Sequence, residues 1–142
     1  MQLPDVNVLI GAFRRDATAH GICARWLSDL VNSQEAFGIS DLACSGFLRV
    51  VTHPRIFDPP SSREDAFAFL STLRGQPNAV IITPGERHWS IFVELCAAAD
   101  ARGDLVPDAF LAALAIESGS EWITFDGDFA RFAGLRWRRP TA

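Results

Sequence analysis

Short apolar runs alternate with longer stretches of helical periodicity along almost the whole chain of 142 residues. The runs that predict strands cover residues 1–5, 37–39, 79–83, 122–125 and 135–138. Between them, apolar residues recur at three- and four-residue steps and predict helices at 18–31, 40–52, 63–73, 84–100 and 107–118, with a shorter helix within 6–13. Since helices that connect strands bring the strands in parallel, this alternation predicts an α/β fold with a mainly parallel sheet covered on both faces.

Polar residues and breakers mark where these helices begin and end. The predicted N-terminal caps are Thr18, Ser40 and either Ser61 or Ser62. Pro107 occupies the first turn of the last long helix, which closes on Gly119.

Length and composition place the chain among packed globular proteins. Its apolar fraction of 49% and charged fraction of 21% exclude a disordered chain. We expect one domain spanning residues 1–142. The longest apolar runs, such as 109–116, fall short of the roughly 20 residues that a membrane span needs, and no signal peptide opens the chain. We therefore expect no membrane association and a cytoplasmic location.

Cysteine usage and charge narrow the function further. Cys23, Cys44 and Cys96 lie far apart in apolar helical patterns, and we expect them to be reduced and buried. A net charge of −4 argues against a protein that coats nucleic acid by bulk electrostatics. All 13 basic residues are arginines, which fits a GC-rich genome but also suits bidentate phosphate binding.

Aspartates follow two of the predicted strands. Asp5 and Asp126 each come directly after an apolar run, and Asp128 is two residues further on. Functional groups of open α/β sheets gather beyond the carboxyl ends of the strands, so both acids are expected at one edge. Asp108, in the first turn of the Pro107 helix, belongs there only if that helix runs back against the next strand.

Crowded carboxylates repel one another unless a cation neutralises them. An all-oxygen set suits Mg²⁺, or Mn²⁺, better than zinc. Such an ion activates water and stabilises the leaving oxygen in phosphodiester cleavage. Each acid also has a simpler interpretation: Asp108 as a helix-terminus acid, and Asp126-Gly127-Asp128 as a plain turn.

Three segments occur in a characteristic order. They are Leu-Pro-Asp-Val-Asn-Val-Leu at 3–9, Pro-Asp-Ala-Phe-Leu-Ala-Ala-Leu-Ala at 107–115 and Ile-Thr-Phe-Asp-Gly-Asp-Phe at 123–129. The combination resembles a PIN domain, and more closely a VapC-type toxin, the ribonuclease half of a type II toxin–antitoxin pair. The resemblance extends over nearly the whole chain.

This resemblance implies a three-layer α/β/α fold and a Mg²⁺-dependent endoribonuclease. It also implies a homodimer inhibited by a small cognate antitoxin, with RNA as the substrate. Asp5 matches the first acid of the family, Asp108 the third and Asp126 the fourth, with Asp128 as an auxiliary acid. Asp5, Asp108 and Asp126 are then the catalytic residues, and all four acids the metal site.

The second acid of the family pattern is missing. Cys44, Ser45 and Gly46 stand where a glutamate is usual, before Phe-Leu-Arg at 47–49. Asp41, one helical turn earlier, shares the face of Cys44 and Ser45 and is a candidate replacement. Equally, Asp41 is an ordinary acid in the first turn of the Ser40-capped helix.

Two other functions remain open. An aspartyl phosphatase would use an acid after its first strand but generally needs a second acid two residues on, where this chain has Asn7. A catalytically impaired PIN-like module that only binds protein is favoured by the missing second acid.

Secondary candidates lie outside the acidic set. The histidines His20, His53 and His88 share no ligand spacing and are interpreted as surface or structural residues, the first two at the rim of the site. Arginines that could hold RNA are Arg49, Arg55, Arg136, Arg138 and Arg139, the last three beside Trp137. Phe67, Phe69, Leu70 and Leu73 form either core or a patch for antitoxin or dimer contact.

Overall fold

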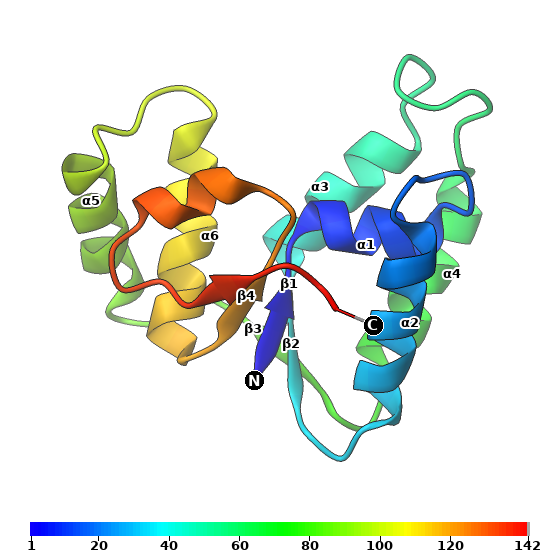
Figure 1. Cartoon of the computed structure of the whole chain (residues 1–142), viewed down its shortest axis with the longest axis horizontal. Helices are drawn as coiled ribbons and strands as arrows, with labels where there is room; N and C mark the ends of the chain where they lie inside the picture. Colours follow the sequence, from blue (N-terminus) through cyan, green and yellow to red (C-terminus); the bar gives the residue numbers. More distant parts are fainter. Residues whose placement is uncertain (142) are drawn as a thin grey trace.

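Five parallel strands form one sheet in the computed structural model, which describes residues 1–141 (Figure 1). In chain order the strands are β1 (Gln2–Pro4), β2 (Phe37–Ser40), β3 (Ala79–Ile82), β4 (Glu121–Ile123) and β5 (Trp137–Arg138). Their order across the sheet is β3-β2-β1-β4-β5, and every neighbouring pair is parallel. The predicted parallel sheet is therefore confirmed, with the first strand at its centre.

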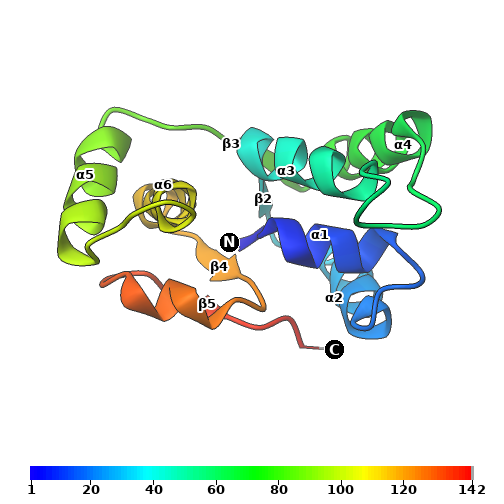
Figure 2. The ribbon, with the colours of Figure 1, turned by 90° about the horizontal axis from the view of Figure 1, so that it is seen from above.

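Helices cover both faces of this sheet. One face carries α1 (Val6–Phe13), α2 (His20–Asn32), α3 (Asp41–Val51) and α4 (Arg63–Arg74). The other carries α5 (His88–Ala98), α6 (Leu105–Ser118) and the 3₁₀ helix η1 (Gly127–Arg131). Figures 1 and 2 show these two groups on opposite sides of the strands, which gives the three-layer α/β/α arrangement. No helix within residues 1–141 is both long and apolar enough to span a membrane.

The strands supply side chains to two separate cores. Successive residues of a strand point to opposite faces, so Trp122 packs with α6 while Ile123 packs with the helices of the other face. Leu3 likewise belongs to the α6 side. On the α1 side, Phe13 and Phe47 meet edge to face with ring centroids 5.3 Å apart, which joins α1 to α3.

Two helices begin later than predicted. α5 starts at His88 rather than Pro84, because the Glu117 carboxylate accepts hydrogen bonds from the backbone N–H groups of Gly85 (2.7 Å) and Arg87 (2.9 Å) and holds that segment as a turn. α2 starts at His20, and the predicted Thr18 cap is wrong.

The start of α2 is set by a contact between helices instead of a local cap. His20 Nδ1 lies 2.9 Å from the carbonyl oxygen of Gly11 in α1. The other helix signals are confirmed. Ser40 caps α3, Ser62 caps α4, and Gly119 ends α6 with a left-handed φ of 68°.

Burial of the cysteines differs from the prediction at one position. All three are unpaired thiols; Cys23 and Cys44 are buried, but Cys96 is only partly buried. Loss of solvation raises the pKa of the Cys23 thiol to about 11.

We expect native-state alkylation at pH 8 to modify Cys96 first and Cys23 last, because the reactive thiolate is scarce and inaccessible at Cys23. Peptide mass spectrometry at successive times measures this order. In urea the three rates should converge. Modification of Cys23 as fast as Cys96 in the native protein would contradict the described core.

Candidate functional site

Asp5 is fixed at the carboxyl edge of the sheet by the pairing of β1 with β4. The register places Pro4 opposite Ile123, and the Asp5 backbone N–H donates to the Ile123 carbonyl at 2.9 Å. Asp5 is also the N-terminal cap of α1, because its Oδ1 accepts from the Val6 N–H at 2.6 Å. Its side chain is therefore held between a strand end and a helix start.

Thr124 connects the two acids that follow strands. Its buried hydroxyl donates to Asp5 Oδ2 at 2.7 Å. Thr124 Oγ1 in turn accepts from the Asp126 backbone N–H at 3.0 Å and from Asn7 Nδ2 at 3.1 Å. Thr124 is not among the site residues predicted from the sequence. The available signal was a hydroxyl placed between the end of an apolar strand and an acid.

Asp126 and Asp128 open the 3₁₀ helix η1. Asp126 Oδ1 accepts from the Asp128 N–H at 2.8 Å, so Asp126 caps this helix as a simple turn residue would. Asp128 is largely exposed and lies 3.9 Å from Arg131 Nε. Cap and ligand roles are compatible, because a carboxylate has a second oxygen and further lone pairs.

Asp108 reaches the same edge because α6 runs back against the sheet before turning into β4. Burial, followed by the charges of Asp5, Asp126 and Asp128, raises the pKa of Asp108 to about 6. Burial also raises the pKa of Asp5, with Asp126 contributing, while hydrogen bonds from Thr124 and Val6 oppose the rise. Asp108 therefore lies within electrostatic reach of the other three predicted site acids.

A cation would relieve this repulsion. Within residues 1–141, no three His, Cys, Asp or Glu side chains are already grouped as a metal-binding cluster. Mg²⁺ does not require such a cluster, since it retains several waters and typically takes one or two carboxylates from the protein. The all-oxygen donor set of Asp5, Asp108 and Asp126 thus fits Mg²⁺ or Mn²⁺.

Asp41, the candidate on α3 for the missing second acid, is engaged by another side chain. Asp41 pairs with Arg74 of α4 at 2.5 Å, and the same guanidinium lies 3.8 Å from Cys44 Sγ. Gly46 packs directly on α1, because a Cβ at this position would stand 2.9 Å from Val6 Cγ2. A side chain at Gly46 therefore requires Val6 to move.

The secondary polar candidates are mostly engaged within the fold. His88 is buried with Nε2 2.9 Å from the Phe110 carbonyl, which makes it a structural residue. Arg138 donates to Glu121 at 2.8 Å and to Gln2 at 2.7 Å, so it fastens β5 to the sheet.

The predicted aromatic patch on α4 is almost entirely core. Leu70 and Leu73 are buried, and Phe69 packs against the rings of Phe13 and Phe47. Phe67 alone of this set is exposed, at 49%. The patch therefore does not exist as a continuous apolar surface.

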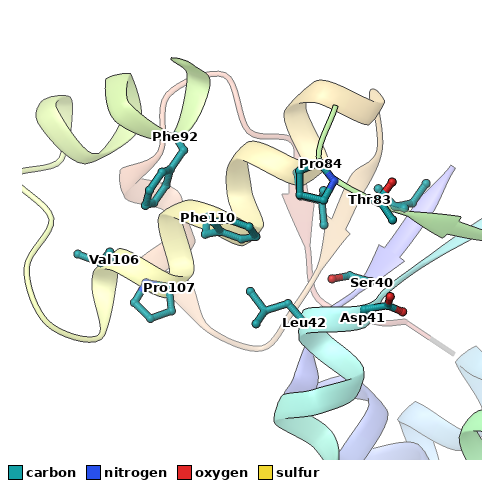
Figure 3. A pocket seen from close by; sticks show the side chains of 11 residues that line it. Ser40, Asp41, Leu42, Thr83, Pro84, Phe92, Val106, Pro107 and Phe110 are labelled. Atoms are coloured by element: carbon teal, nitrogen blue, oxygen red, sulfur yellow. The ribbon is translucent and has the colours of Figure 1, made fainter. Parts of the chain in front are cut away.

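An apolar hollow of about 600 Å³ lies beside the acidic edge (Figure 3). Leu42 of α3 faces Pro107 and Phe110 of α6 across it, and Phe92 of α5 closes its far side. Because Pro107 immediately precedes Asp108, the hollow and the acids share one stretch of α6.

Comparison with known proteins gives consistent matches. A model of the PIN domain family matches residues 3–135. Ribonuclease VapC25 of Mycobacterium tuberculosis is 44% identical over 140 residues, which cover 99% of each chain. Ribonuclease VapC43 of the same organism is 43% identical over 136 residues, 96% of this chain and 92% of that one.

A solved structure with the same fold is VapBC2 from Rickettsia felis bound to a DNA fragment from its promoter. The matching chain has a TM-score of 0.70 at 14% sequence identity, with 97% of both chains covered. This match supports the three-layer arrangement described above.

Replacing Asp108 by Asn should stabilise the protein at neutral pH in EDTA. The folded-state pKa of Asp108 is raised, so its contribution to stability is present below about pH 4 and is lost as the pH rises through about 6. We expect Asp108→Asn to gain about 1 kcal/mol at pH 7.5, after allowance for solvent screening of a half-exposed group.

Urea denaturation at pH 4.0 and pH 7.5 measures this difference. The gain should vanish at pH 4.0, and the exposed control Asp29→Asn should show little change at either pH. An equal gain at both pH values would exclude the cost of ionising the buried Asp108 carboxyl as its cause.

Proposed function

Because this chain belongs to the PIN domain family, and within it to the VapC ribonucleases, we propose that it is a Mg²⁺-dependent endoribonuclease and the toxin of a toxin–antitoxin pair. The observation that carries this proposal is the placement of four aspartates at the carboxyl edge of the sheet, where burial and then the charges of the other three raise the pKa of Asp108. Such a site requires a cation to act on a phosphodiester.

Each acid has a distinct part in the proposed site. Asp5, Asp108 and Asp126 would hold Mg²⁺, or Mn²⁺, while Asp128 orients ligands or water. The bound ion would supply a water of lowered pKa as nucleophile and neutralise the scissile phosphate. Thr124 holds the Asp5 carboxylate and the Asp126 backbone in a fixed relation. An RNA strand can then approach a protein of net charge −4, since the attraction is local.

The main test incubates the purified, partner-free protein with a mixed RNA pool and maps the new ends. We expect cleavage with Mg²⁺ or Mn²⁺ and none in EDTA. Asp108→Asn and Asp126→Asn should each lower the rate at least about a hundredfold, because each removes a ligand. Asp5→Asn is less informative, since its amide keeps the cap of α1 through Oδ1 but its Nδ2 cannot accept from the Thr124 hydroxyl.

Asp41→Asn is the matched control. It removes a carboxylate from the same region, but one that pairs with Arg74, so the cleavage rate should stay near that of the parent. A loss of activity equal to that of Asp108→Asn would identify Asp41 as the replacement acid. Unchanged cleavage in Asp108→Asn would remove the proposed site.

A catalytically impaired binding module is the second candidate. The structure favours it at one point, since α3 contributes Gly46 and an ion-paired Asp41 where a further acid would complete the ligand set. With fewer ligands, metal binding should be weak and activity should need millimolar Mg²⁺ or prefer Mn²⁺. A folded protein that cuts no RNA under either condition would establish the module.

We also propose a small antitoxin as partner and a homodimer as the assembly. The R. felis match is to a protein named VapBC2. An antitoxin segment with apolar side chains suits the hollow between Leu42 and Phe110, and an arginine beside it would pair with the acids. Trp89 and Val93, both exposed on α5, are available for contact between two copies.

Co-expression with the neighbouring small open reading frame should relieve any growth inhibition and allow the two proteins to be purified together. Phe110→Asp should weaken this association, because it places an unpaired charge in the apolar hollow. Phe110 also packs against the rings of His88 and Phe92, so circular dichroism must show that the variant is folded. Light scattering gives the copy number. If co-expression gives neither relief of growth inhibition nor association, the antitoxin proposal is overturned and only the proposed nuclease is left.

A further inference from the structure

A second hollow, of different chemistry, lies at the other end of α3. It has a volume of about 480 Å³ and is lined by Leu48, Arg49, Thr52, Ser61, Arg63 and Phe67. The apolar hollow beside Asp108 is lined mainly by aliphatic and aromatic carbon, whereas this one combines two arginines, two hydroxyls and an exposed aromatic ring. We call it the arginine hollow.

The walls of the arginine hollow are fixed by contacts within the fold. The Ser61 N–H donates to the Val51 carbonyl at 2.8 Å, which brings the end of loop 52–62 back to α3. Arg14 Nη1 donates to both Ser61 Oγ and the Pro59 carbonyl at 3.0 Å. The Arg14 side chain is only 11% exposed and is itself held by Asp16. The wall of the hollow that the loop forms is therefore fixed by contacts within the fold.

The charges at its rim are available to an anion. Arg63 lies 3.7 Å from Glu64, and both side chains are about three-quarters exposed, so this pair is weak. Arg49 is exposed near the last turn of α3. An arginine guanidinium binds phosphate through paired hydrogen bonds. The Ser61 hydroxyl accepts from Arg14 and can still donate its own proton, whereas the Thr52 hydroxyl donates to the Leu48 carbonyl at 2.6 Å.

Phe67 supplies the feature that distinguishes a nucleotide from a free phosphate. Its ring is 49% exposed although it stands on a helix whose other aromatic, Phe69, packs inward. Unpaired bases stack on exposed aromatic rings, and arginines beside such rings bind the phosphates that connect them.

The arginine hollow lies further along α3, toward the C-terminal end of this helix and away from the acidic edge. Gly46 of α3 touches Val6, the residue after Asp5. Arg49 is one helical turn further, about 4.5 Å along the axis. In Figure 1, α3 starts near the end of β1 and runs outward to loop 52–62 beside α1. One RNA strand of a few nucleotides can therefore span both places.

We propose that the arginine hollow is a binding subsite for single-stranded RNA, in which Arg49 and Arg63 hold backbone phosphate and Phe67 stacks one base. This rests on the proposed ribonuclease function and adds the form of its substrate. The subsite binds a nucleotide that flanks the scissile bond, and this binding positions the scissile phosphate at the acids.

Binding and cleavage are measured separately. Binding uses a fluorescent single-stranded RNA and the full chain carrying Asp108→Asn, titrated at several salt concentrations. Arg49→Ala and Arg63→Ala should each weaken binding and reduce the slope of log affinity against log salt by about 0.7. Phe67→Ala should weaken binding about tenfold with the slope unchanged, and Phe67→Trp should restore it.

Arg25→Ala is the matched control, an exposed helical arginine on α2 outside the hollow, and should alter neither affinity nor slope beyond a small general charge effect. In the active protein, Arg49→Ala and Phe67→Ala should raise KM for a long RNA more than they lower kcat. Circular dichroism confirms that each variant is folded.

The outcomes separate the two proposals. If RNA binding depends on Arg49 and Phe67 but the parent cleaves no RNA, the subsite is supported and the ribonuclease proposal is overturned. If the parent cleaves RNA but none of the three substitutions affects RNA binding, the subsite is overturned and the ribonuclease proposal stands. Variants that bind RNA normally but no longer associate with the antitoxin identify a protein contact, which also overturns the subsite. Absence of both cleavage and RNA binding removes both proposals.

Discussion

The hydrogen bond from the Thr124 hydroxyl to Asp5 joins the centre of the sheet to the candidate site. β1 and β4 are neighbours although 116 residues of chain separate Pro4 from Glu121, and their register determines which residues emerge together at the carboxyl edge. Burial of this bond makes it stronger and makes its loss costly, since either group left unpaired would lack water as a substitute. The acids are placed by the sheet, and α1 begins from one of them.

Much of the fold follows from local patterns. Ser40, Ser62 and Gly119 act as predicted because caps and left-handed helix ends depend on neighbouring residues alone. The starts of α2 and α5 were predicted wrongly because they depend on Gly11 and on Glu117, which are distant in sequence. The order of the motifs was enough to predict which acids belong to the site. That these acids lie close together could be seen only from the order of the strands in the sheet. Thr124 and the arginine hollow needed three-dimensional contacts, since neither forms a contiguous motif.

Two hollows of opposite chemistry lie on either side of the acids. α3 contributes Leu42 to the apolar one and Arg49 to the basic one, so a single helix presents different surfaces at its two ends. An apolar peptide segment and an RNA strand would then use different parts of the same edge. They would meet only at the carboxylates, where an arginine and a metal ion compete for the same charge.

The contact between Gly46 and Val6 also limits how such a chain can change over time. A glycine with another helix against its Cα leaves no volume for a side chain, so an acid cannot appear at this position by a single substitution without displacing Val6. A smaller residue at position 6 would first have to create the space, at the cost of packing between α1 and α3. Close packing between positions 6 and 46 therefore makes a new acid at position 46 difficult to acquire and preserves the present set of carboxylates.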